Sequence, residues 1–120
     1  MHTKLIPISD WRRTLDDLSR SYDGAIVSVE ILGGEVGAEE EVHEQPLRGI
    51  TSDRSGVTIR VENPGGLHHD HHVASPKKIR ILETDEGALI AVEIQGDEGM
   101  HSSVQFRSPS RPEIFDPAVE

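Results

Sequence analysis

Cysteine is absent from this chain of 120 residues, and the absence removes several kinds of chemistry at once. Without cysteine there is no disulfide framework, no thiolate metal site and no cysteine nucleophile. The length is close to that of one common domain, so a hydrophobic core must hold the fold without cross-links. We therefore expect a single domain over residues 1–120.

Long apolar runs are missing as well. No stretch reaches the about 20 apolar residues that a membrane span requires. The first residues, MHTKLIPISDW, lack the apolar run of a secretory signal peptide. Both absences favour a cytoplasmic protein, and we expect no membrane partner.

Basic residues are few relative to acidic ones. Twelve Lys and Arg against 22 Asp and Glu give a formal net charge of −10. A surface of this sign repels phosphate backbones, so we expect no nucleic-acid partner. The acids are densest over residues 35–44, EVGAEEEVHE. Such a run is typical of a solvated surface, and the alternative is a docking site for a basic partner.

Aromatic side chains are scarce. The chain has one Trp, one Tyr and two Phe, so the core must be built from Val, Ile and Leu. Aromatic residues commonly line large ligand cavities. Their scarcity therefore favours a small β-rich domain over one that encloses such a cavity.

One helix is predicted near the N-terminus. Between Ser9, a natural N-cap, and Gly24, a common helix stop, apolar residues recur every three or four positions. We predict a helix over about 9–22 that packs one face across a sheet. That face carries Trp11, Leu15, Leu18 and Tyr22.

After the helix the apolar period changes to two, which is typical of strands with one wet face. Alternating segments are AIVSVEIL, VTIRVE, KKIRILE, LIAVEIQ and SVQFR. Residues 38–51 are less regular, because Pro46 should interrupt the ladder and produce an edge, a bulge or two short strands. Short turn-like separators favour antiparallel pairing of neighbours.

These patterns predict an α+β fold. We expect one N-terminal helix packed on a strongly bent antiparallel sheet, or a small barrel, of about six strands. The strands should form a β-meander over about 25–107. A Pro-rich C-terminal tail over 108–120 should be either loose or packed against the sheet through Ile114 and Phe115.

Four blocks, in their order along the chain, resemble a small bacterial family known as domain of unknown function 5335. The blocks are KLIPISDWRRTLDDLSRSYDG, PLRGITSDRSGVTIRV, HVASPKKIRILETDEGALIAVEI and VQFRSP. The resemblance runs from about Leu5 to Pro109. It implies a compact α+β fold with an N-terminal helix, and it implies no activity, cofactor or catalytic residue.

The stretch GGLHHDHHVASP, residues 65–76, is the feature that comes nearest to a metal site. Read as a strand, it places His69 and His71 on the inward face with Val73, and His68, Asp70 and His72 on the other. A His-x-His pair on one face of a strand can chelate Zn, Ni or Fe, but it needs a third and a fourth ligand from elsewhere.

Cupins carry such a pair with a Glu four or five residues beyond the second histidine, where this chain has Ser75 and Pro76. His43 and His101 are the remaining candidates for a further ligand. We predict that the histidines are not a dedicated metal centre, and a site at His69 and His71 is the alternative.

No motif for nucleophilic catalysis or for phosphate binding is present. Asp53, Asp85 and Glu86 lie in segments typical of turns. We therefore predict no catalytic residue and no cofactor, although the sequence leaves catalysis open.

The predicted function is a non-catalytic binding or assembly module of the bacterial cytoplasm, with an unknown ligand and with homo-oligomerisation left open. One alternative is a metal-dependent small β-barrel enzyme that uses His68–His72. The other is an accessory protein that docks a basic partner through residues 35–44.

Overall fold

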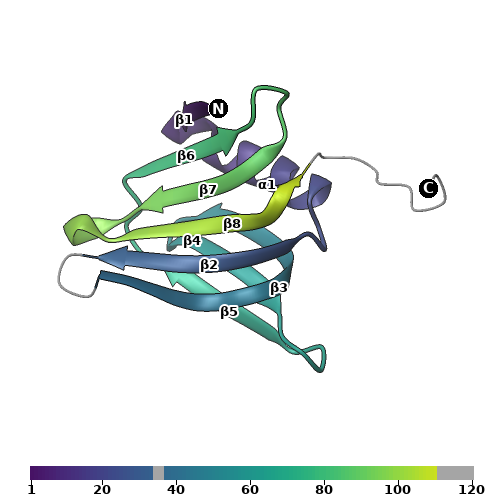
Figure 1. Cartoon of the computed structure of the whole chain (residues 1–120). Coiled ribbons are helices and arrows are strands. Elements are labelled where there is room, and N and C mark those ends of the chain that lie inside the picture. The colour runs from purple at the N-terminus through teal and green to yellow at the C-terminus, as the bar shows by residue number, and fades with distance from the viewer. Residues whose placement is uncertain (34–36, 111–120) are drawn as a thin grey trace.

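The computed structural model describes residues 1–33 and 37–110, the side chains of 108–110 excepted. Within this part of the chain the fold is α+β, with one short α-helix and an open antiparallel sheet of eight strands (Figure 1). The strands are β1 (His2–Ile6), β2 (Ile26–Gly33), β3 (Gly37–Asp53), β4 (Gly56–Glu62), β5 (His68–Val73), β6 (Lys78–Glu83), β7 (Leu89–Gln95) and β8 (His101–Ser110).

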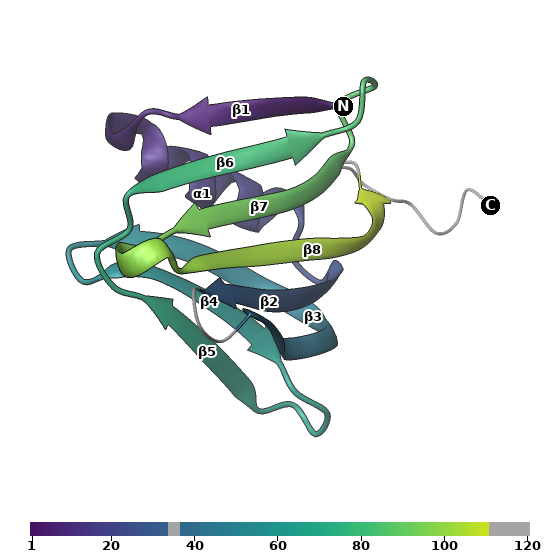
Figure 2. The same ribbon diagram turned by 60° about the vertical axis from the view of Figure 1, so that its left-hand side comes forward.

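The strand order across the sheet is β1-β6-β7-β8-β2-β3-β4-β5. Consecutive strands are neighbours within two runs, β2 to β5 and β6 to β8. The single meander predicted over about 25–107 is therefore interrupted, because β5 and β6 do not lie side by side. The runs join where β8 returns to lie beside β2, and β1 lies beside β6. The two free edges of the sheet are therefore β1 and β5 (Figure 2).

The sheet bends along β3. The first half of this strand pairs with β2, up to Pro46 opposite Ile26, and the second half pairs with β4, from Leu47 opposite Val61. Register shifts occur in both pairings, and Glu44 has a positive φ of 46°. The bulge predicted near Pro46 is thus present, within one continuous strand, at the place where β3 changes partners.

The strand count of about six was too low. Two strands lie outside that count: β5, the histidine-rich stretch, and β1, whose residues are exposed except for the half-buried Ile6. A short edge strand with one buried residue has almost no alternating pattern, so sequence periodicity cannot detect it.

The predicted N-cap was also wrong. Ser9 lies within a 3-10 turn, Ile8–Asp10, and α1 follows at Trp11–Ser21 with Asp10 as its N-cap residue. The amide of Asp10 donates to the Pro7 carbonyl at 2.9 Å, which closes the tight turn before the helix starts. The indole Nε1 of Trp11 then donates to the Ile6 carbonyl at 2.9 Å and ties α1 to the end of β1.

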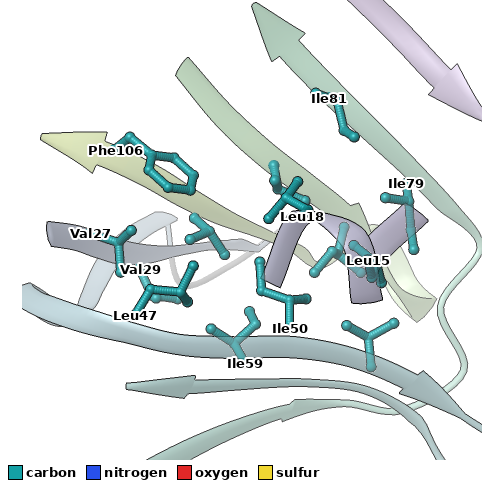
Figure 3. Close-up of a cluster of buried hydrophobic side chains, with 14 of the residues drawn as sticks. Leu15, Leu18, Val27, Val29, Leu47, Ile50, Ile59, Ile79, Ile81 and Phe106 are labelled. Carbon is teal, nitrogen blue, oxygen red and sulfur yellow. The ribbon is translucent and has the colours of Figure 1, made fainter. Parts of the chain in front are cut away.

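The core lies between α1 and the inner face of the bent sheet (Figure 3). Trp11, Leu15 and Leu18 of the helix are buried, as the spacing predicted, and Tyr22 packs against them in a half-buried position. Burying an aliphatic side chain contributes about 1.5–3 kcal/mol. The sheet residues that are fully buried in this core include Val27, Val29, Leu47, Ile50, Ile59, Ile79, Val92 and Val104.

Strand β8 continues to Ser110, so the chain is still in the sheet where the tail was predicted to begin. The two apolar residues expected to anchor the tail, Ile114 and Phe115, lie outside the described residues. Among the described helices, none is long and apolar enough to cross a membrane.

Candidate functional site

The histidine-rich stretch forms the edge strand β5 with the alternation that its sequence predicted. His69 and His71 are half-buried, and they lie opposite Val61 and Ile59 of β4, two residues of the core. They therefore point to the inner face of the sheet. His68, Asp70 and His72 are exposed on the outer face.

The outer face of β5 is tied to β4 and to the turn before it. The guanidinium of Arg60 donates to both carboxylate oxygens of Asp70, at 2.8 and 2.9 Å, and this contact lowers the pKa of Asp70. His72 uses both ring nitrogens, with Nδ1 at 2.9 Å from Thr58 Oγ1 and Nε2 at 2.9 Å from the Ser55 carbonyl. A carbonyl only accepts, so Nε2 carries the proton and Nδ1 accepts from the hydroxyl.

The histidines on the inner face of β5 have fewer hydrogen-bond partners. His71 Nε2 lies 3.1 Å from the hydroxyl of Ser102, a buried residue of β8. Burial lowers the pKa of His71, and the nearby carboxylate of Glu41 opposes that effect. In the described part of the chain, His69 Nε2 is buried without a hydrogen-bond partner. An unsatisfied buried polar atom of this kind costs about 1–3 kcal/mol.

The two histidines do not meet a further ligand within one chain. Over residues 1–33 and 37–110, no group of three or more His, Asp or Glu side chains is arranged to hold a metal ion. His43 is engaged by Glu40 and Glu44, at 3.0 and 3.4 Å, and the Glu40 contact raises its pKa. His101 lies at the start of β8 and is not brought to His69 and His71 as a ligand.

The acidic segment is on the surface where the structure describes it. Glu39, Glu40 and Glu41 are exposed in the first half of β3, whereas Glu35 lies outside the described residues. Glu40 lies directly opposite Glu30 of β2 in the sheet. Two carboxylates in opposed positions repel each other, so this part of the sheet favours a cation or a basic group as its neighbour.

Sequence reasoning missed an open cleft of about 370 Å³ at one end of the sheet. Its apolar side is Trp11, which is 8% exposed, and Ile8, which is 71% exposed. The other lining residues belong to the β3–β4 and β5–β6 connections and the strand ends beside them, which the fold brings to the start of α1. The cleft, called here the Trp11 cleft, is lined by Ile8, Trp11, residues 52–56 and residues 74–76.

Asp53 in this lining has the turn role that its sequence context predicted. Its Oδ1 accepts from the amide and the hydroxyl of Ser55, at 2.7 and 2.6 Å, and these contacts lower the pKa of the carboxyl group. The only local signal for the cleft was Ile8, an apolar residue outside the helical stripe. The convergence of three distant segments has no signature in any short stretch.

Comparison with known proteins places the chain in a family. The model of a family of unknown function, DUF5335, matches residues 2–113. The chain belongs to this family. The resemblance seen in the sequence blocks is therefore confirmed, over a longer stretch than the blocks themselves covered.

A relative within curated proteins supports the same conclusion. It is an uncharacterized protein of Aquifex aeolicus (strain VF5), 31% identical over 99 residues, which are 82% of this chain and 86% of the relative. No solved structure matches the chain. The family and the relative assign no function, so the site must be interpreted from its own geometry.

Proposed function

We propose that this chain is a non-catalytic binding module of the bacterial cytoplasm, and that the Trp11 cleft receives an apolar side chain of a partner protein. The observation that carries the proposal is the position of Ile8. This side chain is 71% exposed, although it lies beside the buried Trp11 at the opening of a cleft. An exposed apolar residue that rims a hollow with an aromatic wall is typical of a recognition surface.

The free edge next to the cleft supports the same proposal. Among the residues that the structure describes, strand β1 pairs only with β6, so its other side is available for strand addition. Pro7 and Ile8 follow directly after β1 and lead into the cleft. An extended segment of a partner that pairs with β1 can therefore continue into the cleft, so that backbone hydrogen bonds supply affinity and one apolar side chain supplies specificity.

The single tryptophan makes the proposal testable without a label. Peptides are selected from a random library displayed on phage, against the immobilised full-length chain, and the selected peptides are titrated while Trp11 fluorescence is recorded. We expect the selected peptides to share an apolar anchor and to change the Trp11 emission on binding.

Two variants compare the cleft with a matched exposed position elsewhere. Ile8→Glu should weaken peptide binding by about tenfold or more, because it puts a charge into an apolar contact. Leu67→Glu changes a residue that is 74% exposed in the β4–β5 connection, and it should leave the affinity unchanged. Equal effects of the two substitutions, or selected peptides without a common anchor, would reject the cleft as the binding site.

A further inference from the structure

The inner face of β5 presents two imidazoles whose hydrogen-bonding capacity is poorly used. The buried Nε2 of His69 has no partner in the described part of the chain, and His71 Nε2 meets only the hydroxyl of Ser102. Burial normally selects for satisfied polar groups. The unsatisfied nitrogen of His69 on an edge strand, beside a second imidazole that contacts one hydroxyl, therefore suggests that a further group completes the pair.

The pair has the spacing of a chelate. His69 and His71 are two positions apart on one strand, and side chains in that relation point to the same face about 6–7 Å apart. Imidazole is a preferred ligand for Zn, Cu and Ni, which need three or four protein ligands in a dedicated site. One chain supplies only two in its described residues, so each copy holds half of a site.

A second copy that pairs with the edge of β5 can supply the other two ligands. We propose that a second copy of this chain adds its β5 antiparallel to the first, and that His69 and His71 of both copies together bind one zinc-class metal ion. Strand β5 ends the sheet order, so no strand from residues 1–33 or 37–110 occupies that edge (Figure 2).

Symmetry restricts the register of this pairing, and the shared metal ion selects it. A two-fold axis perpendicular to the sheet keeps both inner faces on one side, so only residues that face the same way can lie opposite each other. Pairing centred on Asp70 places His69 opposite the His71 of the second copy, and His71 opposite its His69. Cross-strand Cβ atoms are then about 4.5–5.5 Å apart, which lets four imidazoles converge on one ion at the usual Zn–N distance of about 2.0–2.1 Å.

The outer face does not provide an equivalent site. Both ring nitrogens of His72 already have partners, and Asp70 is held by Arg60 through two hydrogen bonds. A metal at His68 and His72 would have to break these contacts, whereas a metal on the inner face would satisfy His69. The inner pair is therefore the metal site and the outer pair is not.

Charge makes the association depend on the metal. Each chain carries a formal net charge of −10, so two copies repel each other without a counter-charge. A dication at the seam offsets part of this repulsion and supplies the bonds that hold the strands together. We therefore expect a monomer in the presence of a chelator and a dimer in the presence of zinc.

The test uses the tag-free, full-length chain, because a histidine tag would itself bind zinc. The mass is measured by light scattering after gel filtration in EDTA, in zinc chloride and in magnesium chloride, and the metal is quantified in the protein peak. The expected result is a doubled mass with one zinc per two chains, and a monomer in EDTA and in magnesium, since imidazole is a poor magnesium ligand.

Substitutions separate the inner face from the outer one. His69→Ala and His71→Ala should each abolish the zinc-dependent dimer, while His68→Ala, on the outer face of the same strand, should retain it. Far-ultraviolet circular dichroism and a thermal melt in EDTA establish that each variant is folded, and His69→Gln replaces His69→Ala if the alanine variant is not.

Three results would overturn the inference. They are no zinc retained by the folded chain, zinc bound one per chain without a change of mass, and a dimer that His68→Ala weakens as much as His69→Ala does. None of them concerns the Trp11 cleft, so the inference and the proposed function fail independently.

Discussion

At the scale of single residues, His71 shows how the environment changes a side chain that the sequence presents as one of four similar histidines. Its neighbours His68 and His72 are exposed, whereas His71 is half-buried against β4 and contacts Ser102. Burial disfavours the charged imidazolium and lowers the pKa of His71. The burial of His71 on the inner face therefore makes its imidazole resist protonation.

The first prediction concerns the pH dependence of stability. The pKa of His71 in the folded chain is below the ordinary value of 6.5 for an exposed histidine. Its contribution to stability is therefore complete above that value, and it is lost as the pH falls through the folded pKa. Burial disfavours the charged form of His71, Glu41 favours it, and His69 and His72 disfavour it. The measured loss of stability therefore reports the combined effect of burial and these charges.

The measurement is the melting temperature of the chain in EDTA between about pH 7.5 and about pH 5, a range that begins above the ordinary histidine pKa of about 6.5 and ends well below it. His71→Gln should flatten the fall on acidification, because the glutamine amide can still reach Ser102 and carries no titratable proton. His68→Gln, at an exposed position of the same strand, should leave the fall unchanged. A fall of the same size in wild type and His71→Gln would contradict the assignment.

At the scale of elements, Ser19 shows how α1 is fixed to the sheet beyond its apolar stripe. Its hydroxyl accepts from the Ile50 amide at 2.8 Å, and it lies 2.7 Å from the Leu15 carbonyl and 2.9 Å from the Ile50 carbonyl, to either of which it can donate. Ile50 lies in the part of β3 that has left β2, so its free backbone groups need another partner. One serine of the helix supplies it.

The second prediction follows from this contact. Ser19→Ala should lower the free energy of unfolding by about 1–3 kcal/mol, because it leaves the Ile50 amide without a partner in the interior. Ser21→Ala, at an exposed position near the end of the same helix, should change it by less than about 0.5 kcal/mol. Chemical denaturation of both variants measures the difference. Alanine is the better helix former, so helix propensity alone would stabilise both variants, and similar losses in the two would show that the bond to β3 is not what stabilises the fold at Ser19.

The third prediction tests the orientation of α1. Leu15 is fully buried, so Leu15→Ala should lower the free energy of unfolding by about 2–4 kcal/mol. Arg12 is exposed on the opposite side, and Arg12→Ala should cost less than about 0.5 kcal/mol. Urea denaturation of the two variants gives both values, and equal losses would be incompatible with the packing shown in Figure 3.

At the scale of the whole molecule, the sheet joins segments that are far apart along the chain. The N-terminal strand β1 lies beside β6, and the ammonium group of Met1 lies 2.6 Å from Asp85 in the turn after β6. Strand β8 likewise returns to pair with β2. The outer surface is acidic, and it includes the opposed pair Glu30 and Glu40 near the exposed Glu39 and Glu41.

The fourth prediction concerns this charge. Replacing Glu39, Glu40 and Glu41 with Gln should leave the melting temperature unchanged or slightly higher, because like-charge repulsion decreases while no buried contact is lost. The ion pair of Glu40 with His43 is lost, but it is exposed and contributes little to stability. Glu41 favours only the charged form of His71, which burial disfavours, so its replacement has little effect near neutral pH. Calorimetric scans at low and high salt measure the effect, which added salt should reduce. A large loss of stability would show that these carboxylates have partners essential to the fold.

The sequence by itself determined those features that depend on backbone geometry over a few residues. Two periodic patterns are the apolar stripe of α1, which is Trp11, Leu15 and Leu18, and the alternation of β5. In both elements the side chains that face the interior are those that the pattern predicted. Helical and extended backbones repeat every 3.6 and 2 residues whatever surrounds them, so such patterns can be interpreted from the chain alone. The same reasoning failed for β1, which has too few buried residues to show a pattern.

Only the tertiary structure decided which distant segments became neighbours. It placed Ser102 against His71, brought residues 74–76 to Trp11 to form the cleft, and made β5 and β1 the two edges of the sheet. Each of these arrangements depends on segments that are far apart along the chain. They arise because burying the apolar faces of all strands and of α1 together leaves few possible arrangements, and that requirement acts on the whole chain at once.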